Sequence, residues 1–225
     1  MTYESTRNTV ETYFDRTATK TWERLTSDAP VSSIRATVRA GRNRMRQLLL
    51  SQLPADLRGA RVLDAGCGTG ALAFQLAQAG ADVVAVDISP KLITIAKQRQ
   101  PAHVSGTLKL MAGDMFDPGL GHFDHIVAMD SLIYYSAEDI GATLDRVSSR
   151  VLTNIVFTVA PRTPLLMAMW RIGKLFPRND RSPMMVPHQM TQIAKSTSGQ
   201  ISDIDRVASG FYISQALELD RKSVV

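Results

Sequence analysis

The stretch VLDAGCGTGALAFQLAQAGADVVAVDIS, residues 62–89, predicts a strand, a glycine-rich turn, a helix and a second strand. The turn carries Gly66, Gly68 and Gly70. Glycine suits a sharp turn because it lacks a Cβ, so a ligand can also approach its backbone closely. The helix that follows begins with free backbone N–H groups, which attract an anionic group. The stretch therefore predicts a ligand-binding loop between a strand and a helix.

Two acids stand at the ends of the predicted strands. Asp64 lies just before the turn, and Asp87 ends the second strand, 21 residues after Gly66. At the end of that strand a carboxylate can accept hydrogen bonds from both ribose hydroxyls of an adenosine. The glycine spacing is G-x-G-x-G, whereas nicotinamide dehydrogenases use G-x-G-x-x-G. The pattern therefore departs from the dinucleotide fingerprint but keeps the acid that binds a ribose.

Outward from this stretch, short runs rich in β-branched residues alternate with helical patterns. This alternation predicts an α/β, Rossmann-like fold: a mostly parallel seven-stranded sheet with helices on both faces. The last two strands form an antiparallel C-terminal hairpin through Ser209–Gly210. The predicted strands are 61–65, 82–86, 107–112, 122–129, 151–159, 200–209 and 211–219, and the helices among them are 70–79, 89–99, 137–149 and 188–198.

The flanking segments are helical and basic. Helices are predicted over 4–27 and 31–53, and a further one over 164–176 is followed by an irregular loop. We therefore expect an N-terminal helical arm or lid over 1–54 and a core over 55–225, with a substrate-covering insertion at about 160–187. Residues 31–46 hold five arginines and no acid, and residues 161–187 hold five basic residues and one acid. Such segments suit an anionic ligand or surface, or are solvated arginines that aid solubility.

The composition limits the class of protein. With 225 residues, 44% of them hydrophobic, the chain is long and apolar enough for one folded domain, and Cys67, its single cysteine, excludes an intramolecular disulfide. We see neither a signal-peptide pattern nor an apolar run of about 18 residues that could span a membrane. We expect a cytoplasmic protein whose basic, amphipathic segments suit peripheral contact with the inner or a photosynthetic membrane.

The central motifs resemble those of class I S-adenosylmethionine-dependent methyltransferases. The resemblance rests on DAGCGTG followed by VDIS, on Gly113-Asp114-Met115 after the third strand, and on FDHIVAMDSL, residues 123–132. It covers about residues 60–160 and implies S-adenosylmethionine as cofactor, with S-adenosylhomocysteine as product. It implies that Asp64, Gly66, Cys67, Gly68 and Gly70 hold the methionine end, that Asp87 with Ile88 and Ser89 holds the adenosine, that Asp114 and Met115 frame the base, and that Asp130 faces the methionine amino group or the mouth of the site.

The flanks are similar to those of the magnesium-protoporphyrin O-methyltransferases of chlorophyll and bacteriochlorophyll synthesis. The similar stretches are YFDRTATKTWERL (13–25), the basic helix, MDSLIYYSAED (129–139) and VAPRTPLLMAMWRIGKLFPRNDRS (159–182). The resemblance implies esterification of one propionate of magnesium-protoporphyrin IX, with the porphyrin-binding subunit of magnesium chelatase as a candidate partner. Members from oxygenic phototrophs carry histidine where Tyr134 stands. We therefore expect Tyr134 and Asp130 to position the reactants, with no essential base.

A flat, apolar, dianionic macrocycle calls for aromatic walls and for a cation that binds the unreacted propionate. The expected aromatic and methionine walls are Tyr13, Phe14, Trp22, Tyr134, Met167, Met169, Trp170 and Phe176, and the expected anchors are Arg35, Arg39, Arg162, Arg171 and Lys174. The apolar members of the 164–176 helix fit an ordinary core equally well. Magnesium would enter with the substrate, so we expect no protein-bound metal.

Three other interpretations stay open. The chain could methylate another small acid, a quinone or a polyketide, or it could carry porphyrin without catalysis. An RNA methyltransferase would use the basic arm. Residues 130–135 lack the N/D-P-P-Y/F tetrapeptide that often marks nucleic-acid amine methylation, so we expect no nucleic-acid partner.

Overall fold

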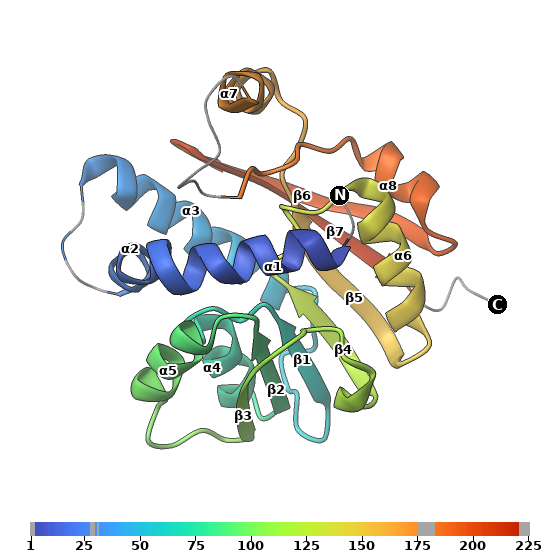
Figure 1. The fold of residues 1–225 in the computed structure, drawn as a ribbon. Helices are drawn as coiled ribbons and strands as arrows, with labels where there is room; N and C mark the ends of the chain where they lie inside the picture. Colours follow the sequence, from blue (N-terminus) through green and yellow to red (C-terminus); the bar gives the residue numbers. More distant parts are fainter. Residues whose placement is uncertain (1–2, 28–29, 31, 175–182, 221–225) are drawn as a thin grey trace.

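Seven strands form one sheet in the order β3-β2-β1-β4-β5-β7-β6 (Figure 1). The computed structural model describes residues 3–27, 30, 32–174 and 183–220. The strands are β1 (Arg61–Ala65), β2 (Asp82–Asp87), β3 (Thr107–Ala112), β4 (Phe123–Ala128), β5 (Val151–Val159), β6 (Gln200–Ser209) and β7 (Tyr212–Asp220). β1 to β5 pair in parallel, whereas β7 is antiparallel to both β5 and β6. The predicted fold class is confirmed.

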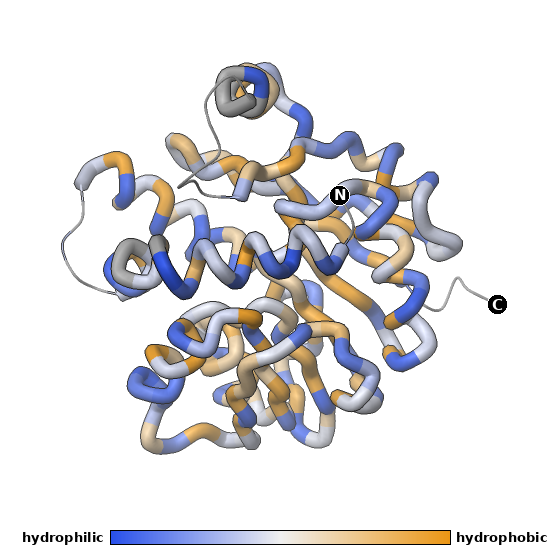
Figure 2. Tube along the Cα trace, viewed as in Figure 1, coloured by the Kyte–Doolittle hydropathy of each residue, from blue (hydrophilic) through white to orange (hydrophobic). Residues whose placement is uncertain are grey.

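Helices cover both faces of the sheet because the strands are apolar on both sides. On one face, Leu63 and Ile126 pack with Leu144 of α6 (Ala137–Ser148) and Ile193 of α8 (Met190–Ser196). The other face is covered by α3 (Ser33–Leu50), α4 (Ala71–Gln78) and α5 (Pro90–Arg99). Figure 2 shows hydrophobic residues gathered in the central strands and hydrophilic ones on the outer turns of the helices. The parallel strands are therefore buried on both faces, as is usual for parallel sheets.

The strand order reverses between β1 and its neighbours β2 and β4. In open α/β sheets, ligands bind outside the carboxyl ends of the strands at such a reversal. The glycine loop follows β1 directly and leads into α4, so it lies at this position. The topology therefore places the ligand-binding loop where a crevice is expected.

The N-terminal segment crosses the carboxyl ends of the strands as α1 (Tyr3–Tyr13), the π-helical turn η1 (Phe14–Ala18) and α2 (Thr19–Leu25) (Figure 1). The sequence predicts one helix over 4–27, and the structure differs by this wider turn. Phe14 and Ala18, at the two ends of the turn, both pack against α5, while Asp15 accepts a hydrogen bond from the Ser89 hydroxyl. The arm is therefore attached to the loop that follows β2.

Helix α3 packs against the C-terminal hairpin. Its Met45 and Leu49 are fully buried, and a Cβ on Gly41 would lie 2.6 Å from the Tyr212 ring. The predicted boundary between the arm and the core at residue 54 stays a prediction. Helix α3 lies on the arm side of this boundary, yet its buried residues belong to the core. The hairpin turn is Gly210–Phe211, one residue beyond the predicted one, because Ser209 and Tyr212 form its last pair.

The 160–187 segment contains α7 (Pro164–Lys174), which lies at the top of the molecule in Figure 1. A bridge between Pro161 and His188 ties its two ends together. Residues 175–182, with the predicted Phe176, lie outside the described part of the chain. Among the described residues, no helix is both long and apolar enough to cross a membrane.

Candidate active site

A deep cleft lies between the carboxyl ends of β1, β2 and β4 and the helices α1, α2 and α3. Its open space, including the part continuous with solvent, is about 960 Å³. The structure brings most of the predicted site residues together here. The predicted residues that line the cleft are Phe14, Trp22, Asp64, Gly66, Cys67, Gly68, Asp87, Ile88, Asp114, Met115, Asp130 and Tyr134.

The glycine loop forms the floor of the cleft. Gly66 has φ +83°, and a Cβ there would lie 2.3 Å from Cβ of Ser131, so only glycine fits. Gly70 also has a left-handed φ, +86°, and directly precedes α4. Burial raises the pKa of the Cys67 thiol well above its usual value, and Asp64 and Asp87 add to the shift. Cys67 is therefore a protonated small residue of the loop rather than a reactive thiolate.

Asp64 ends β1 with a carboxylate that has lost nearly all contact with water. The residue is 1% exposed, and its Oδ2 has no hydrogen-bond partner among the described residues. Burial, with the nearby charge of Asp87, raises the pKa of Asp64 to about 7, although the Ala73 N–H and Arg46 oppose the shift. A buried acceptor without a donor is costly, so this atom is suited to a cationic ligand group.

Asp87 is held by the backbone on both of its oxygens. Gly68 N donates to Oδ2 at 2.8 Å, and Ser89 N donates to Oδ1 at 2.9 Å. Burial raises the pKa of Asp87 to about 6, against the effect of these two hydrogen bonds. The carboxylate is thereby fixed beside the loop, where its remaining lone pairs can accept from a diol. Ser89 itself begins α5, and its hydroxyl accepts from Leu92 N.

The third predicted acid, Asp114, binds the arm. Tyr3 donates its hydroxyl to Oδ1 at 2.8 Å, and Arg7 Nη1 lies 3.0 Å from Oδ2. The Tyr3 ring stacks on Tyr135 with centroids 4.9 Å apart. The start of α1 therefore closes the end of the cleft that Asp114 and Met115 frame. Sequence reasoning missed Tyr3 and Arg7, because nothing local relates them to Asp114.

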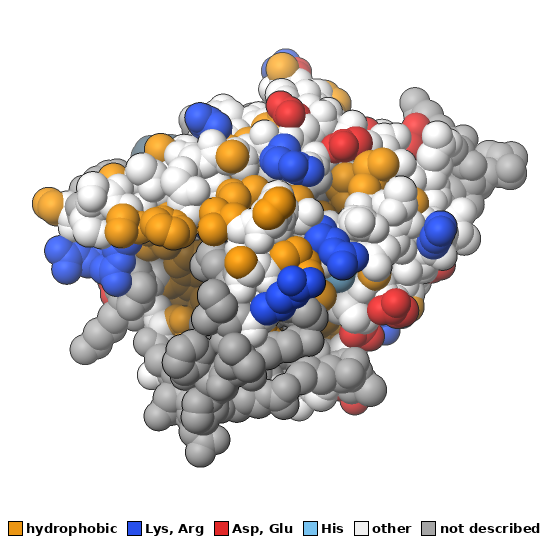
Figure 3. All heavy atoms as spheres, turned by 90° about the horizontal axis from the view of Figure 1, so that it is seen from above, with side chains coloured by type: hydrophobic (Ala, Val, Ile, Leu, Met, Phe, Trp, Pro, Cys, Tyr) orange, Lys and Arg blue, Asp and Glu red, His pale blue; other side chains and the backbone are white. Residues whose placement is uncertain are grey.

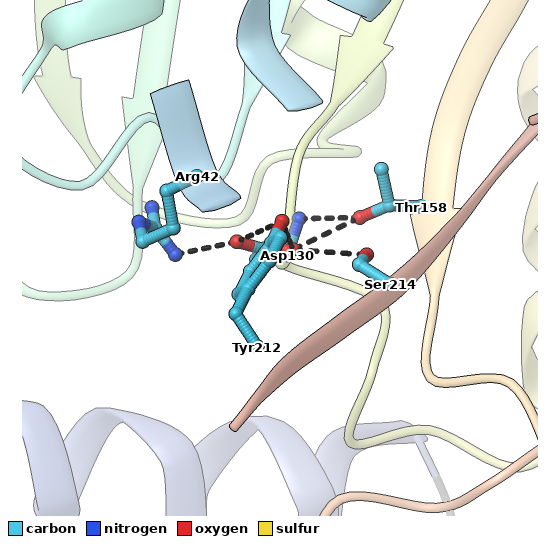
Figure 4. A network of polar contacts seen from close by, with 5 residues as sticks. All are labelled: Arg42, Asp130, Thr158, Tyr212 and Ser214. Carbon is cyan, nitrogen blue, oxygen red and sulfur yellow. Dashed lines mark hydrogen bonds and ion pairs between the residues drawn. The ribbon is translucent and has the colours of Figure 1, made fainter. Parts of the chain in front are cut away.

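Asp130 occupies the centre of a polar network (Figure 4). Arg42 Nη1 lies 2.5 Å from its Oδ2, the Tyr212 hydroxyl donates at 3.0 Å to Oδ1, and the Ser214 hydroxyl donates to Oδ1 at 3.4 Å. The Asp130 N–H donates to Thr158 Oγ1 at 2.7 Å. Its φ of 57° is left-handed, which Asp tolerates better than most residues. The carboxylate is therefore already engaged by groups of the protein.

Aromatic side chains form one wall. Phe14 and Trp22 stack at 5.8 Å, and Tyr134 meets Phe14 edge-on at 6.4 Å. Tyr13 also meets Phe14 edge-on, at 5.3 Å, although it packs beside this wall rather than lining the cleft. Burial raises the pKa of the Tyr134 hydroxyl, with Asp130 adding to the shift, so it stays protonated. Tyr134 can therefore donate a hydrogen bond but cannot act as a base near neutral pH.

The predicted propionate anchors do not meet in this cleft. Arg39 donates to the carbonyl oxygens of Arg24 and Leu25, while Arg35 and Arg171 are exposed. Arg162 lines a separate hollow beside His188. The side chains of Met169, Trp170 and Lys174 lie outside the described part of the structure. The roles assigned to all of these residues stay predictions.

The arginines that do line the cleft are Arg7, Arg42 and Arg46. Arg42 and Arg46 each follow a buried residue of the Gly41, Met45, Leu49 stripe of α3. A long side chain next to a buried stripe lies at the edge of the packed face, but Arg44, on the other side of Met45, is exposed, so helical periodicity alone does not select these two arginines. Arg42 also lies over the Trp22 ring, with its guanidinium carbon 4.7 Å from the centroid.

Comparisons with known proteins agree with this geometry. A family model described as "Magnesium-protoporphyrin IX methyltransferase C-terminus" matches residues 128–221, and a "Methyltransferase domain" model matches 62–154. The chain is 57% identical to the magnesium-protoporphyrin O-methyltransferase of Rhodobacter capsulatus, over 96% of this chain and 97% of that one. It is 32% identical to that of Synechocystis, over 94% and 95%.

A crystal structure of the Synechocystis magnesium protoporphyrin IX methyltransferase with bound S-adenosylhomocysteine superposes with a TM-score of 0.80 and 28% identity, covering 96% of this chain and 99% of that one. A second crystal structure of that enzyme, with bound S-adenosylmethionine, gives a TM-score of 0.76 at 26% identity, over 96% and 97%. The present chain belongs to the magnesium-protoporphyrin IX O-methyltransferase family of S-adenosylmethionine-dependent methyltransferases.

Proposed function

We propose that this chain transfers a methyl group from S-adenosylmethionine to a propionate carboxylate of magnesium-protoporphyrin IX, giving the monomethyl ester. The observation that carries the proposal is the 57% identity to the Rhodobacter capsulatus enzyme over 96% of the chain. That span includes the arm and the segment after β5, which are outside residues 62–154, the range that the general methyltransferase-domain model matches. Substrate choice depends on such flanking parts.

The cleft residues fit the cofactor. Asp64 offers a buried, unpartnered oxygen to the methionine ammonium, and Asp87 offers lone pairs to the ribose diol. The Gly68 backbone borders open space, because a Cβ there would meet nothing within 4 Å. The loop of Gly66, Cys67, Gly68 and Gly70 would hold the methionine end, Ile88 and Ser89 the adenosine, and Met115 with Asp114 the base. When bound, S-adenosylmethionine supplies an electrophilic methyl group on its sulfonium.

The protein's contribution to the chemistry is positioning. A propionic acid has a pKa near that of Glu, about 4.3, so the accepting group is already a carboxylate at pH 7. No side chain then has to remove a proton, which agrees with a Tyr134 that stays protonated. Holding two reactants in line and excluding water can supply roughly 7–11 kcal/mol. Phe14, Trp22 and Tyr134 would support the macrocycle, and the network around Asp130 would keep this end of the cleft rigid.

Mass spectrometry of the products tests the proposal. The protein is incubated with S-adenosylmethionine and either magnesium-protoporphyrin IX or the metal-free porphyrin. We expect a gain of one methyl group, larger with the magnesium form. No methylated porphyrin, from protein that binds S-adenosylhomocysteine, would contradict the substrate and favour another small acid or a quinone. Tight porphyrin binding without product would favour a carrier.

We also propose that α1, η1 and α2 act as a lid over the cleft, together with the segment around α7. The arm touches the loop after β2 through Asp15 and the end of β3 through Tyr3 and Arg7. Its removal would open the cofactor site. Unchanged turnover and product release after deletion of residues 1–28 would contradict the lid role of this arm.

Peripheral membrane contact is a further part of the proposal. Exposed apolar side chains include Leu165 on α7, Met184 and Met185 after it, and Phe211 at the hairpin tip. Figure 3 shows hydrophobic side chains gathered on the upper face next to several basic ones. Such a surface suits anionic lipid. Sedimentation with anionic and neutral vesicles tests it: no binding to either would contradict membrane contact, and equal binding to both would contradict the preference for anionic lipid. Delivery of substrate by the porphyrin-binding subunit of magnesium chelatase is tested separately, by pull-down.

A further inference from the structure

Arg46 is a cation without a protein partner in the middle of the cleft. It is half-buried, lines the cleft, and makes no hydrogen bond or ion pair within the described ranges 3–27, 30, 32–174 and 183–220. Its pKa is lowered by burial and by the charge of Arg42, and the acids Asp64 and Asp130 only partly offset this. A half-buried guanidinium that lines a cleft without a protein partner is suited to an anionic ligand group.

The two acids near Arg46, Asp64 and Asp130, differ in whether their carboxylate oxygens already have partners. Asp130 is bound by Arg42, Tyr212 and Ser214, so its charge is already balanced. Asp64 has one buried oxygen without a donor, and it lies too far from Arg46 for an ion pair. The cleft therefore holds one unpaired acid and one unpaired base close together but not bonded to each other.

This arrangement is complementary to an α-amino acid group. An ammonium and a carboxylate on one carbon atom would bind Asp64 and Arg46 respectively, and each charge of the zwitterion would meet its opposite. The position along α3 agrees, because Arg46 is one helical turn beyond Arg42 and lines the same cleft as Asp64 and the glycine loop. Arg42 is already engaged, because its guanidinium lies over the Trp22 ring and pairs with Asp130.

We propose that Arg46 binds the α-carboxylate of the methionine end of S-adenosylmethionine, while Asp64 binds its ammonium. The proposal rests on the cofactor assignment of the proposed function and adds a cofactor-binding residue from α3. The alternative source of a carboxylate is the porphyrin, whose propionate would then bind Arg46. The two sources are separated by a binding experiment that contains no porphyrin.

The experiment compares S-adenosylmethionine with its decarboxylated form by calorimetric titration. Loss of a charge-assisted interaction weakens binding about 10- to 100-fold. We expect the wild-type protein to bind the decarboxylated form that much more weakly. Arg46→Met should weaken S-adenosylmethionine to the same extent and leave the decarboxylated form unchanged. Arg46→Lys keeps the charge but loses the two parallel N–H donors of the guanidinium. Its preference for S-adenosylmethionine over the decarboxylated form should be intermediate.

Arg44→Met is the matched control. It removes the same charge from the exposed side of α3, where Arg44 donates to the Ala208 carbonyl at 3.0 Å. It should leave both affinities unchanged. Binding of 5′-methylthioadenosine, which lacks the whole amino acid end, reports whether the adenosine part of the site is intact in each variant.

Two results would overturn the proposal. One is a wild-type protein that binds both forms equally, which needs no variant and so does not depend on variant folding. The other is an Arg46→Met protein that keeps the wild-type preference; weaker binding of magnesium-protoporphyrin IX to it would then assign Arg46 to the substrate. Failure of porphyrin methylation would leave this test unaffected, because no porphyrin is present.

Discussion

Arg42 and Asp130 are 88 residues apart in the chain, yet Arg42 Nη1 lies 2.5 Å from Asp130 Oδ2. Their side chains are 18% and 7% exposed, so the ion pair is largely shielded from water. Tyr212, from the C-terminal hairpin, donates to the same carboxylate. Asp130, which follows β4, thus connects α3 and β7 at the cleft. Helix α3 and the C-terminal hairpin therefore belong to one site although they are far apart in the sequence.

Asp130→Asn should lower the free energy of unfolding by about 1–3 kcal/mol, because it leaves Arg42 without a counter-ion. Asn tolerates the left-handed φ of 57°, so the substitution removes the charge and one acceptor oxygen without straining the backbone. Urea denaturation measures the change. The double variant with Arg42→Met should lose less than the sum of the two single changes. Strict additivity would show that the pair is not coupled.

Asp87→Ala should raise the KM for S-adenosylmethionine about 10- to 100-fold, since the carboxylate that we propose to bind the ribose also holds the N–H groups of Gly68 and Ser89. The kcat at saturating cofactor should change much less. Steady-state kinetics at varied cofactor concentration measure both constants. An unchanged KM would remove Asp87 from the ribose site.

Cofactor affinity should rise with pH between about 5.5 and 7.5. Burial raises the pKa values of Asp64 and Asp87 from 3.8 to about 7 and about 6, and an ammonium or diol binds the ionised carboxylates. Binding should therefore release protons, which titration in buffers of different ionisation enthalpy detects. Asp64→Asn should remove most of the dependence, whereas the exposed Asp205→Asn should not. A pH-independent affinity would contradict the raised pKa values.

The raised pKa of Asp64 also determines how its contribution to the stability of the protein changes with pH. Between pH 4 and 7 the folded, ligand-free protein binds more protons at Asp64 than the unfolded chain, in which the pKa is near 3.8. The contribution of Asp64 to the free energy of unfolding therefore falls as pH rises through this window. Relative to wild type, Asp64→Asn should be more stabilising at pH 7 than at pH 5, as measured by urea denaturation at each pH. The opposite trend would show that Asp64 is ionised in the free protein.

Arg7→Met should speed release of S-adenosylhomocysteine about two- to fivefold, because it removes the ion pair between the arm and Asp114. The effect is small since the two side chains are 31% and 24% exposed, and such pairs contribute about 0.2–1 kcal/mol. Stopped-flow displacement measures the rate. Arg16→Met, at an exposed position of the same arm, should leave it unchanged. Equal rates in all three proteins would mean that this contact does not hold the lid.

Tyr134→Phe should retain kcat within about tenfold, because a protonated phenol can contribute at most one neutral hydrogen bond, about 0.5–1.5 kcal/mol. The rise of the Tyr134 pKa also predicts no increase in kcat between pH 7 and 9 that depends on this residue. Single-turnover methylation measures both. A loss of several hundredfold would show a role beyond positioning.

The sequence predicted the sheet, its hairpin and the cofactor loop, because each depends on patterns within a few tens of residues. It did not predict the π-helical turn in the arm, whose Phe14 and Ala18 pack against the distant helix α5. It also placed Arg39 among the substrate anchors, whereas Arg39 satisfies carbonyl groups at the end of α2. Orphan carbonyls at a helix end attract nearby cations, but only the docked helices show which one is close.

The sequence by itself determined Asp64, the glycine turn and Asp87, since a strand, a tight turn and a helix fix the relative positions of residues 64–87 locally. Only the tertiary structure decided which arginines of α3 enter the cleft. Periodicity shows which face of that helix is apolar, but the surroundings of Arg42 and Arg46 depend on how α3 packs on the hairpin of β6 and β7. Asp130 and Tyr212, 82 residues apart, meet for the same reason: long-range packing, which no local pattern encodes, brings them together.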